Sequence, residues 1–92
     1  MLSFVHNTGA GGCFQGEVLT TYDKLVSVFG KPTFGKGDKV NVEWRLLFSD
    51  GTQASIYDWK EDTIPLGPHE WHIGGVNKES VNRVREVLET VQ

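Results

Sequence analysis

The sequence predicts a small α+β domain in which an antiparallel sheet is packed against two helices. Two segments carry apolar residues at helical spacing, and between them lies a long stretch of alternating apolar and polar residues that is typical of a β-hairpin. Short strands before the first helix and before the second complete the order β-β-α-β-β-β-α, with about five strands. The chain of 92 residues has room for one domain, residues 1–92.

The first helix is predicted over Tyr22–Phe29, where apolar residues recur at i, i+3, i+4 and i+7. Thr20 stands three residues before Asp23 in a weak capping box, and Gly30 is placed to end the helix. The polar, glycine-rich segment Phe34–Lys39 is then expected to form a mobile loop.

The central hairpin is predicted over Val40–Trp59, and its turn decides which residues share a face. A two-residue turn at Asp50–Gly51 would mix apolar and charged side chains on one face. A three-residue turn at Ser49–Gly51, with its glycine in the left-handed region, gathers the apolar side chains on one side, so we expect this turn. It places Trp44 opposite Ile56 and Glu43 opposite Tyr57.

Three further segments complete the prediction. Glu70–Ile73 is expected to be a short strand, and Lys78–Thr90 a helix with Asn77 as its N-cap. Leu2–His6 and Cys13–Leu19 are expected to be two short strands joined by a glycine-rich turn, and their pairing stays open.

Composition excludes several classes of protein. No apolar run approaches the roughly 18 residues that span a bilayer, and the N-terminal residues do not resemble a signal peptide. We therefore expect no membrane partner and a cytoplasmic location. The net charge is −3, and direct nucleic-acid binding is instead indicated by a strongly positive charge. We therefore expect no direct nucleic-acid binding.

Two motifs suggest a bound ion but are incomplete. The turn Thr8–Gly12 has the glycines that let a backbone approach a phosphate, yet it lacks the Gly-Lys-Ser/Thr ending of a P-loop. His69 and His72 flank Glu70, but residues three apart on a strand point to opposite faces. We therefore assign no metal and no cofactor.

No catalytic residue is assigned either. Cys13 would act as a nucleophile only beside a base, and a hairpin of the first two strands would bring His6 within reach. A lone cysteine is more often a small buried side chain, which is the interpretation favoured here. The carboxylates of Asp58, Glu61 and Asp62 are expected to be solvated at a strand end.

The strongest functional indication is the polar face of the predicted sheet. It combines aromatic anchors with charged side chains, a mixture that interfaces favour, and its candidate binding residues are Glu43, Arg45, Tyr57, Trp59, Lys60 and His72. Alternatively, the last helix or a second subunit covers this face and makes it part of a core.

Two motifs, Tyr57-Asp58-Trp59-Lys60 and Trp71-His72-Ile73-Gly74-Gly75, carry a resemblance to a family of small proteins of tailed bacteriophages. The resemblance extends from about Phe14 to Gly75, and members often have a longer insertion between the two motifs. It implies a phage protein that acts inside a bacterial host. Small phage proteins of this kind commonly act by binding host proteins.

Three hypotheses follow. The first is a non-catalytic inhibitor that binds a host protein, such as a component of a bacterial defence system like CRISPR–Cas. The second is a homo-oligomer, at its simplest a homodimer, that sequesters a small nucleotide immune signal at a subunit interface. The third is a nucleotide-directed hydrolase that uses His72 with Asp58 or Glu70, and the sequence favours the two non-enzymatic hypotheses over it.

Overall fold

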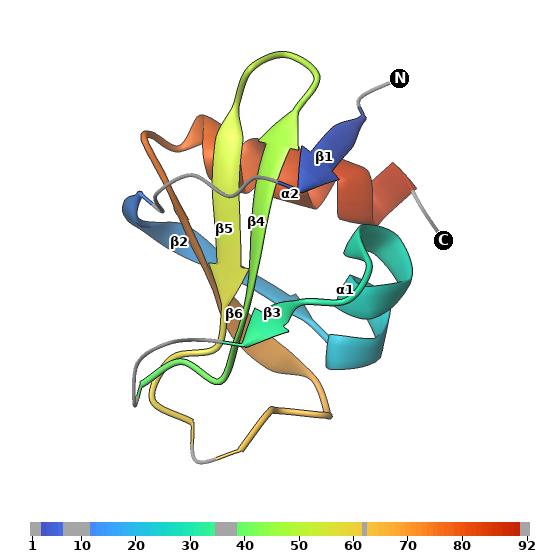
Figure 1. Ribbon diagram of the computed structural model, residues 1–92, viewed down its shortest axis with the longest axis vertical. Helices are drawn as coiled ribbons and strands as arrows, with labels where there is room; N and C mark the ends of the chain where they lie inside the picture. The colour runs from blue at the N-terminus through green and yellow to red at the C-terminus, as the bar shows by residue number, and fades with distance from the viewer. Residues whose placement is uncertain (1–2, 7–11, 35–38, 62, 91–92) are drawn as a thin grey trace.

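The computed structural model describes residues 3–6, 12–34, 39–61 and 63–90, and it confirms a small α+β fold (Figure 1). Residues 8–11 of the glycine-rich turn, residues 35–38 of the predicted loop and Asp62 lie outside the described residues. The elements are β1 (Phe4–His6), β2 (Cys13–Thr20), α1 (Tyr22–Phe29), β3 (Thr33–Phe34), β4 (Val42–Phe48), β5 (Gln53–Tyr57), β6 (His69–Gly75) and α2 (Glu79–Thr90).

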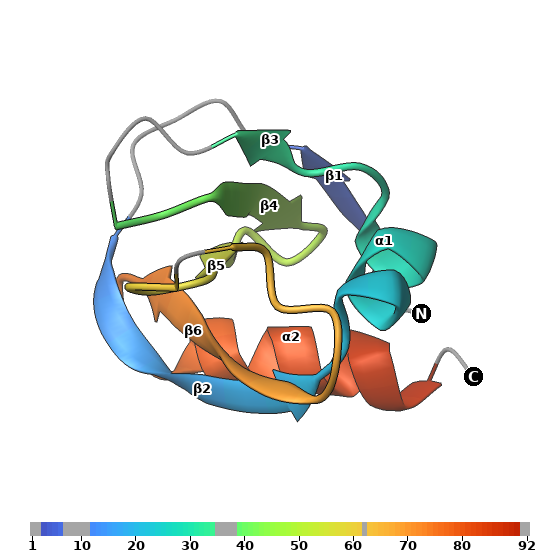
Figure 2. The same ribbon diagram turned by 90° about the horizontal axis from the view of Figure 1, so that it is seen from below.

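All six strands belong to one antiparallel sheet of order β1-β4-β5-β6-β2, in which β3 also pairs with β4. β1 and β2 lie at opposite ends of this curved sheet (Figure 2). The helices pack on one face, where α2 contacts β2, β5 and β6, as well as α1.

The central hairpin has the predicted register. Trp44 lies opposite Ile56 and Glu43 lies opposite Tyr57. The Phe48 N–H donates to the Thr52 carbonyl over 2.8 Å, and Gly51 has a φ of +92°, as a three-residue turn with a left-handed glycine requires. One face of β4 and β5 is therefore apolar and the other polar.

The first two strands do not form a hairpin with each other. β1 pairs with β4, whereas β2 pairs with β6, so His6 and Cys13 lie on strands at opposite edges of the sheet. An isolated two-stranded hairpin is only marginally stable, and each strand instead joins a larger sheet that has one buried face. A contact between Cys13 and His6 would have needed this hairpin, and Cys13 is exposed rather than buried as expected.

Other differences concern the ends of elements. The N-cap of α1 is Thr21 rather than Thr20, because Thr20 is still paired in β2 and the Thr21 hydroxyl accepts the Lys24 N–H over 3.1 Å. β3 was not predicted, since its two residues form a strand only through pairing with β4, which no local pattern indicates. At α2, Asn77 Oδ1 accepts the Glu79 N–H over 2.9 Å, which agrees with its predicted capping role.

The core lies between the sheet and the helices. Two buried indoles, Trp44 and Trp71, meet edge to face with ring centroids 5.6 Å apart. The Trp44 Nε1–H donates over 2.8 Å to the carbonyl of Gly30, which ties the end of α1 to β4. The other buried apolar residues are Leu25, Phe29, Val42, Leu46, Phe48, Ala54, Ile56, Ile73, Val81, Val84 and Val87.

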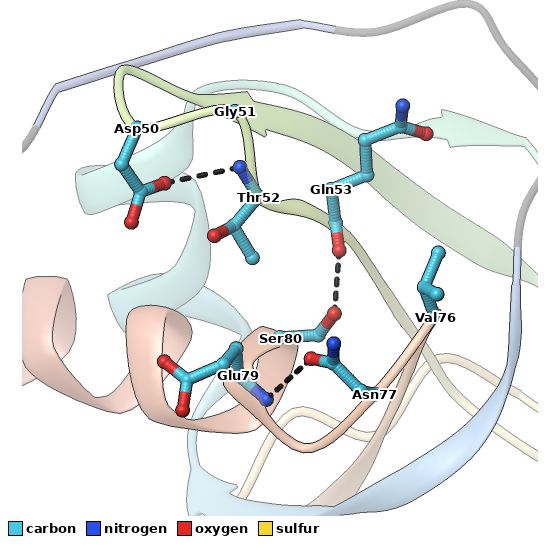
Figure 3. A pocket seen from close by; sticks show the side chains of 8 residues that line it. All are labelled: Asp50, Gly51, Thr52, Gln53, Val76, Asn77, Glu79 and Ser80. Carbon is cyan, nitrogen blue, oxygen red and sulfur yellow. Dashed lines mark hydrogen bonds between the residues drawn. The ribbon is translucent and has the colours of Figure 1, made fainter.

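Gly75 allows α2 to approach the sheet closely. A Cβ at this position would collide with the Ser80 side chain, whose hydroxyl donates over 2.5 Å to the Gln53 carbonyl (Figure 3). Space at Gly75 therefore determines how closely the first turn of α2 packs against β5 and β6.

We expect Gly75→Ala to lower the free energy of unfolding by about 1 to 3 kcal/mol, because the new methyl group overpacks this contact. Urea denaturation measures the loss. Gly67→Ala is the control, since a Cβ there meets no atom within 4 Å. Equal free energies of unfolding for the two variants would show that the contact between Gly75 and Ser80 accommodates the methyl group without loss of stability.

Asp50 and Arg83 connect the hairpin turn to α2. Arg83 Nε lies 2.6 Å from Asp50 Oδ2, and this hydrogen bond, with the Thr52 N–H, lowers the pKa of the Asp50 carboxyl from 3.8 to about 2. A lowered pKa in the folded state means stabilisation that is fully present above pH 3.8 and is lost as pH falls towards 2.

We expect wild type to be more stable than Asp50→Asn near neutral pH, with a difference that shrinks as pH falls through this window. The asparagine retains an oxygen for the Thr52 N–H but has no second acceptor for Arg83, so the comparison removes the carboxylate's charged hydrogen bond with Arg83 and keeps the bond to Thr52. Urea denaturation at several pH values measures it. A difference in the free energy of unfolding that is independent of pH would contradict the lowered pKa of Asp50.

Candidate binding surface

The sheet face turned away from the helices carries a row of side chains across four strands. Glu43 of β4 lies opposite Tyr57 of β5, Tyr57 lies opposite His72 of β6, and His72 lies opposite Glu17 of β2. Side chains on directly opposed residues of neighbouring strands interact. The row exists because every strand alternates its side chains, and the core-facing set fixes which residues point the other way.

An aromatic cluster lies on and beside this row. We define it as Phe14, Tyr57, Trp59 and His72. The Trp59 indole stacks on the His72 imidazole with ring centroids 6.2 Å apart at 23°, and Tyr57 meets both rings edge-on. Phe14 of β2 lies 4.7 Å from His72. These contacts restrict the rings before any ligand arrives, which lowers the entropy lost on binding.

Parts of the cluster remain accessible to solvent. Trp59 is 39% exposed and Phe14 is 53% exposed, whereas Trp44 and Trp71 of the core are 1% and 0% exposed. Because α2 packs against the other face, this helix does not cover the cluster, contrary to one of the alternatives considered from the sequence.

Charged groups surround the aromatic cluster. Arg45 Nε binds Glu43 Oε1 over 2.9 Å, and His72 Nε2 lies 3.6 Å from Glu17 Oε2. Burial raises the pKa of the Tyr57 phenol above its usual value, and the negative charge of Glu43 raises it further. Tyr57 therefore remains a protonated hydrogen-bond donor near neutral pH.

Two lysines approach the indole of Trp59. The Lys39 Nζ lies 5.7 Å from the ring centroid and the Lys60 Nζ lies 5.9 Å from it. Both distances are within the range of a cation–π interaction. These lysines come from the two chain segments at the open end of the hairpin, since Lys39 precedes β4 and Lys60 follows β5.

Asp58 holds those two segments together and is the main correction to the sequence-based site. It was expected to be solvated, yet it is fully buried. Its carboxylate accepts hydrogen bonds from the N–H of Asn41, the Nδ2 of Asn41 and the N–H of Val42 over 2.8, 2.7 and 3.1 Å. Three donors satisfy the carboxylate, which is what allows a charged group to be buried.

The backbone adds a second connection beside Asp58. The Lys60 N–H donates to the Lys39 carbonyl over 2.8 Å, and the Nδ2 of Asn41 also donates to the Glu61 carbonyl over 2.9 Å. Lys60 has a φ of +57°, a conformation that non-glycine residues rarely adopt. The contacts of the surrounding segments therefore hold Lys60 in an unfavourable backbone conformation next to Trp59.

The structure brings the six predicted site residues to one region of the molecule. Glu43, Arg45, Tyr57 and His72 lie on the strands, and Trp59 and Lys60 follow directly after β5. Sequence reasoning missed Phe14, Glu17 and Lys39. The first two reach the surface through the pairing of β2 with β6, which no local pattern indicated.

The groups considered for catalysis or metal binding are dispersed. The buried Asp58 bonds to Asn41 and Val42, so of the two carboxylates considered as the partner of His72 in a hydrolase, this one is already engaged. His69 pairs with Glu61 over 3.3 Å, whereas His72 faces Glu17. Within the described residues, no group of three or more histidine, cysteine, aspartate or glutamate side chains is arranged to hold a metal ion.

A hollow lies between the β4–β5 turn and the start of α2 (Figure 3). Its volume is about 320 Å³. Hydrogen bonds join many of its polar groups to one another, from Thr52 to Asp50, from Glu79 to Asn77 and from Ser80 to Gln53. These bonds stabilise the junction of the turn with the helix, so we assign the hollow a structural role.

Comparison with protein-family models, curated proteins and solved structures finds no match for this chain. The resemblance to a phage protein family therefore stays a prediction from the sequence. In the described part of the chain, neither helix is long and apolar enough to cross a membrane.

We expect Asp58→Asn to lower the free energy of unfolding by about 1 to 3 kcal/mol, because the new amide sets a donor against the Asn41 Nδ2 donor. Urea denaturation measures the loss. Asp23→Asn is the matched control, since Asp23 is exposed in the first turn of α1 and its charge there is worth less than about 1 kcal/mol. An unchanged midpoint for Asp58→Asn would show that the bonds contribute no net stability.

Proposed function

We propose that this chain is a non-catalytic binding protein that inhibits a bacterial host protein, and that its aromatic cluster forms the centre of the contact. The observation that carries this proposal is an exposed, stacked Trp59 on a sheet face that neither helix covers. Tryptophan, tyrosine and arginine are enriched among residues that dominate the free energy of protein association.

The chemistry of the surface suits a protein partner better than an apolar ligand. Aromatic rings lie at its centre, and the charged side chains of Glu43, Arg45, Lys60 and Lys39 lie around them. An apolar centre with a polar rim is the usual organisation of an interface between proteins. The resemblance to phage proteins supplies the setting, so the partner class that we propose is a component of a bacterial defence system.

A second candidate function is sequestration of a small nucleotide. It is favoured by the two lysines at Trp59, because an indole can stack on a base while ammonium groups meet phosphates. A surface this open would need a second copy of the chain to enclose the ligand. Isothermal calorimetry with cyclic di- and trinucleotides tests it, and native mass spectrometry reports whether a dimer carries the nucleotide.

We expect Trp59→Ala to weaken the complex with its partner by more than about 2 kcal/mol, a loss of roughly 30-fold in affinity, as for an interface hot spot. The partner is first captured from defence-bearing bacterial hosts, then purified, and its dissociation constant is measured by calorimetry. Val76→Ala is the matched control, because Val76 is an exposed apolar residue beside α2, at 82% exposure.

Folding of the variants is checked separately. Trp59→Ala is expected to unfold at nearly the wild-type urea concentration, whereas Trp44→Ala, which empties part of the core, should lose about 3 to 5 kcal/mol. A partner that binds Trp59→Ala as tightly as wild type would overturn the proposal, as would the absence of any specific partner in every host tested.

A further inference from the structure

Two lysines place positive charge next to Trp59. The ammonium groups of Lys39 and Lys60 both lie within 6 Å of its ring centroid. Among the described residues, no ion pair involves either ammonium, while Glu43 and Glu61 pair with Arg45 and His69. The two lysines therefore present positive charge to solvent beside the most accessible indole of the chain.

This positive charge stands out against the rest of the molecule. The whole chain carries a net charge of −3. On α2, by contrast, Arg83 lies within ion-pair distance of three carboxylates, those of Asp50, Glu79 and Glu86. These carboxylates compensate its charge, whereas no carboxylate among the described residues pairs with the lysines at Trp59.

The positions of the two lysines are set before a ligand binds. The backbone bond from Lys60 to Lys39 and the bonds from Asn41 to Asp58 and Glu61 hold their two segments side by side. The left-handed conformation of Lys60 is part of this arrangement. Prior ordering of this kind reduces the entropy lost on binding, and the positive charge favours a negatively charged ligand over a positively charged one.

We propose that the partner residue that docks at Trp59 carries a carboxylate, so that the surface recognises an acidic protein segment. The apolar part of that segment packs on the indole, and its carboxylate accepts hydrogen bonds from the ammonium groups of Lys39 and Lys60. This inference rests on the proposed function and narrows it to a class of partner.

Defined probes test the inference on the full chain labelled with ¹⁵N. The first is a capped peptide of alternating glutamate and leucine, and the second is its lysine–leucine counterpart, which has the same apolar content and the opposite charge. The third is inorganic tripolyphosphate. The Trp59 indole N–H resonance, assigned by its absence from the spectrum of Trp59→Phe, reports binding directly.

We expect the glutamate–leucine peptide to shift the Trp59 resonance saturably and at lower concentration than either other probe. The shift should weaken as salt is raised from 0.1 M to 1 M, since the screening length falls from about 10 Å to about 3 Å. Lys39→Gln and Lys60→Gln should each weaken peptide binding by roughly two- to five-fold, the size expected for exposed charge interactions.

Lys78→Gln is the matched control. It removes the same charge from an exposed lysine just before α2, away from the cluster, and is expected to leave peptide binding unchanged. A weakening equal to that of Lys39→Gln and Lys60→Gln would show a response to overall charge and would overturn the inference. A response of equal strength to the lysine–leucine peptide would overturn it too.

Tighter binding of tripolyphosphate than of the acidic peptide would also overturn the inference, and would favour the nucleotide. The proposed function can survive such results. If a purified host protein needs Trp59 for binding but is insensitive to Lys39→Gln and Lys60→Gln, the binding function stands and only its preference for an acidic segment is wrong.

Discussion

The register of the β4–β5 hairpin is the constraint on which the rest of the structure depends. Side chains on a strand alternate between faces, so a shift of one residue would exchange the core for the surface. With Trp44 opposite Ile56, the apolar side chains of both strands face the helices. The same pairing sets Glu43 opposite Tyr57 and thereby starts the row that His72 and Glu17 complete. One geometric condition at the turn thus determines both the core and the candidate binding surface.

The strands alone do not place the residues that surround Trp59. Trp59 and Lys60 follow β5, and Lys39 precedes β4, in segments where the ladder of strand hydrogen bonds has ended. The buried carboxylate of Asp58 replaces that ladder with bonds to the backbone and side chain of Asn41 and to the backbone of Val42. A buried charge is costly to leave unpaired, so these bonds hold the segments in one arrangement. The exposed part of the surface is therefore positioned by a residue that no ligand would touch.

The chemistry of this surface suits the proposed binding function. His72, the histidine at its centre, is surrounded by aromatic rings and Glu17, and burial raises the pKa of the Tyr57 phenol further above neutral pH. Stacked rings, a phenol hydroxyl and lysines without an ion-pair partner among the described residues suit recognition of a complementary surface. Such an arrangement would recognise the proposed partner by shape and charge, and ordering before binding is how a small domain can achieve tight association with few residues.

The sequence by itself determined whatever depends on local periodicity and turn chemistry. Helical spacing located Tyr22–Phe29, and the three-residue turn with Gly51 determined the hairpin register and the face that carries Arg45 and Tyr57. Only the tertiary structure decided the neighbours of β1 and β2, because edge strands choose partners far along the chain and no local pattern records that choice. For the same reason the burial of Asp58 could not be predicted, since the donors that compensate its charge lie at Asn41 and Val42, more than a dozen residues away.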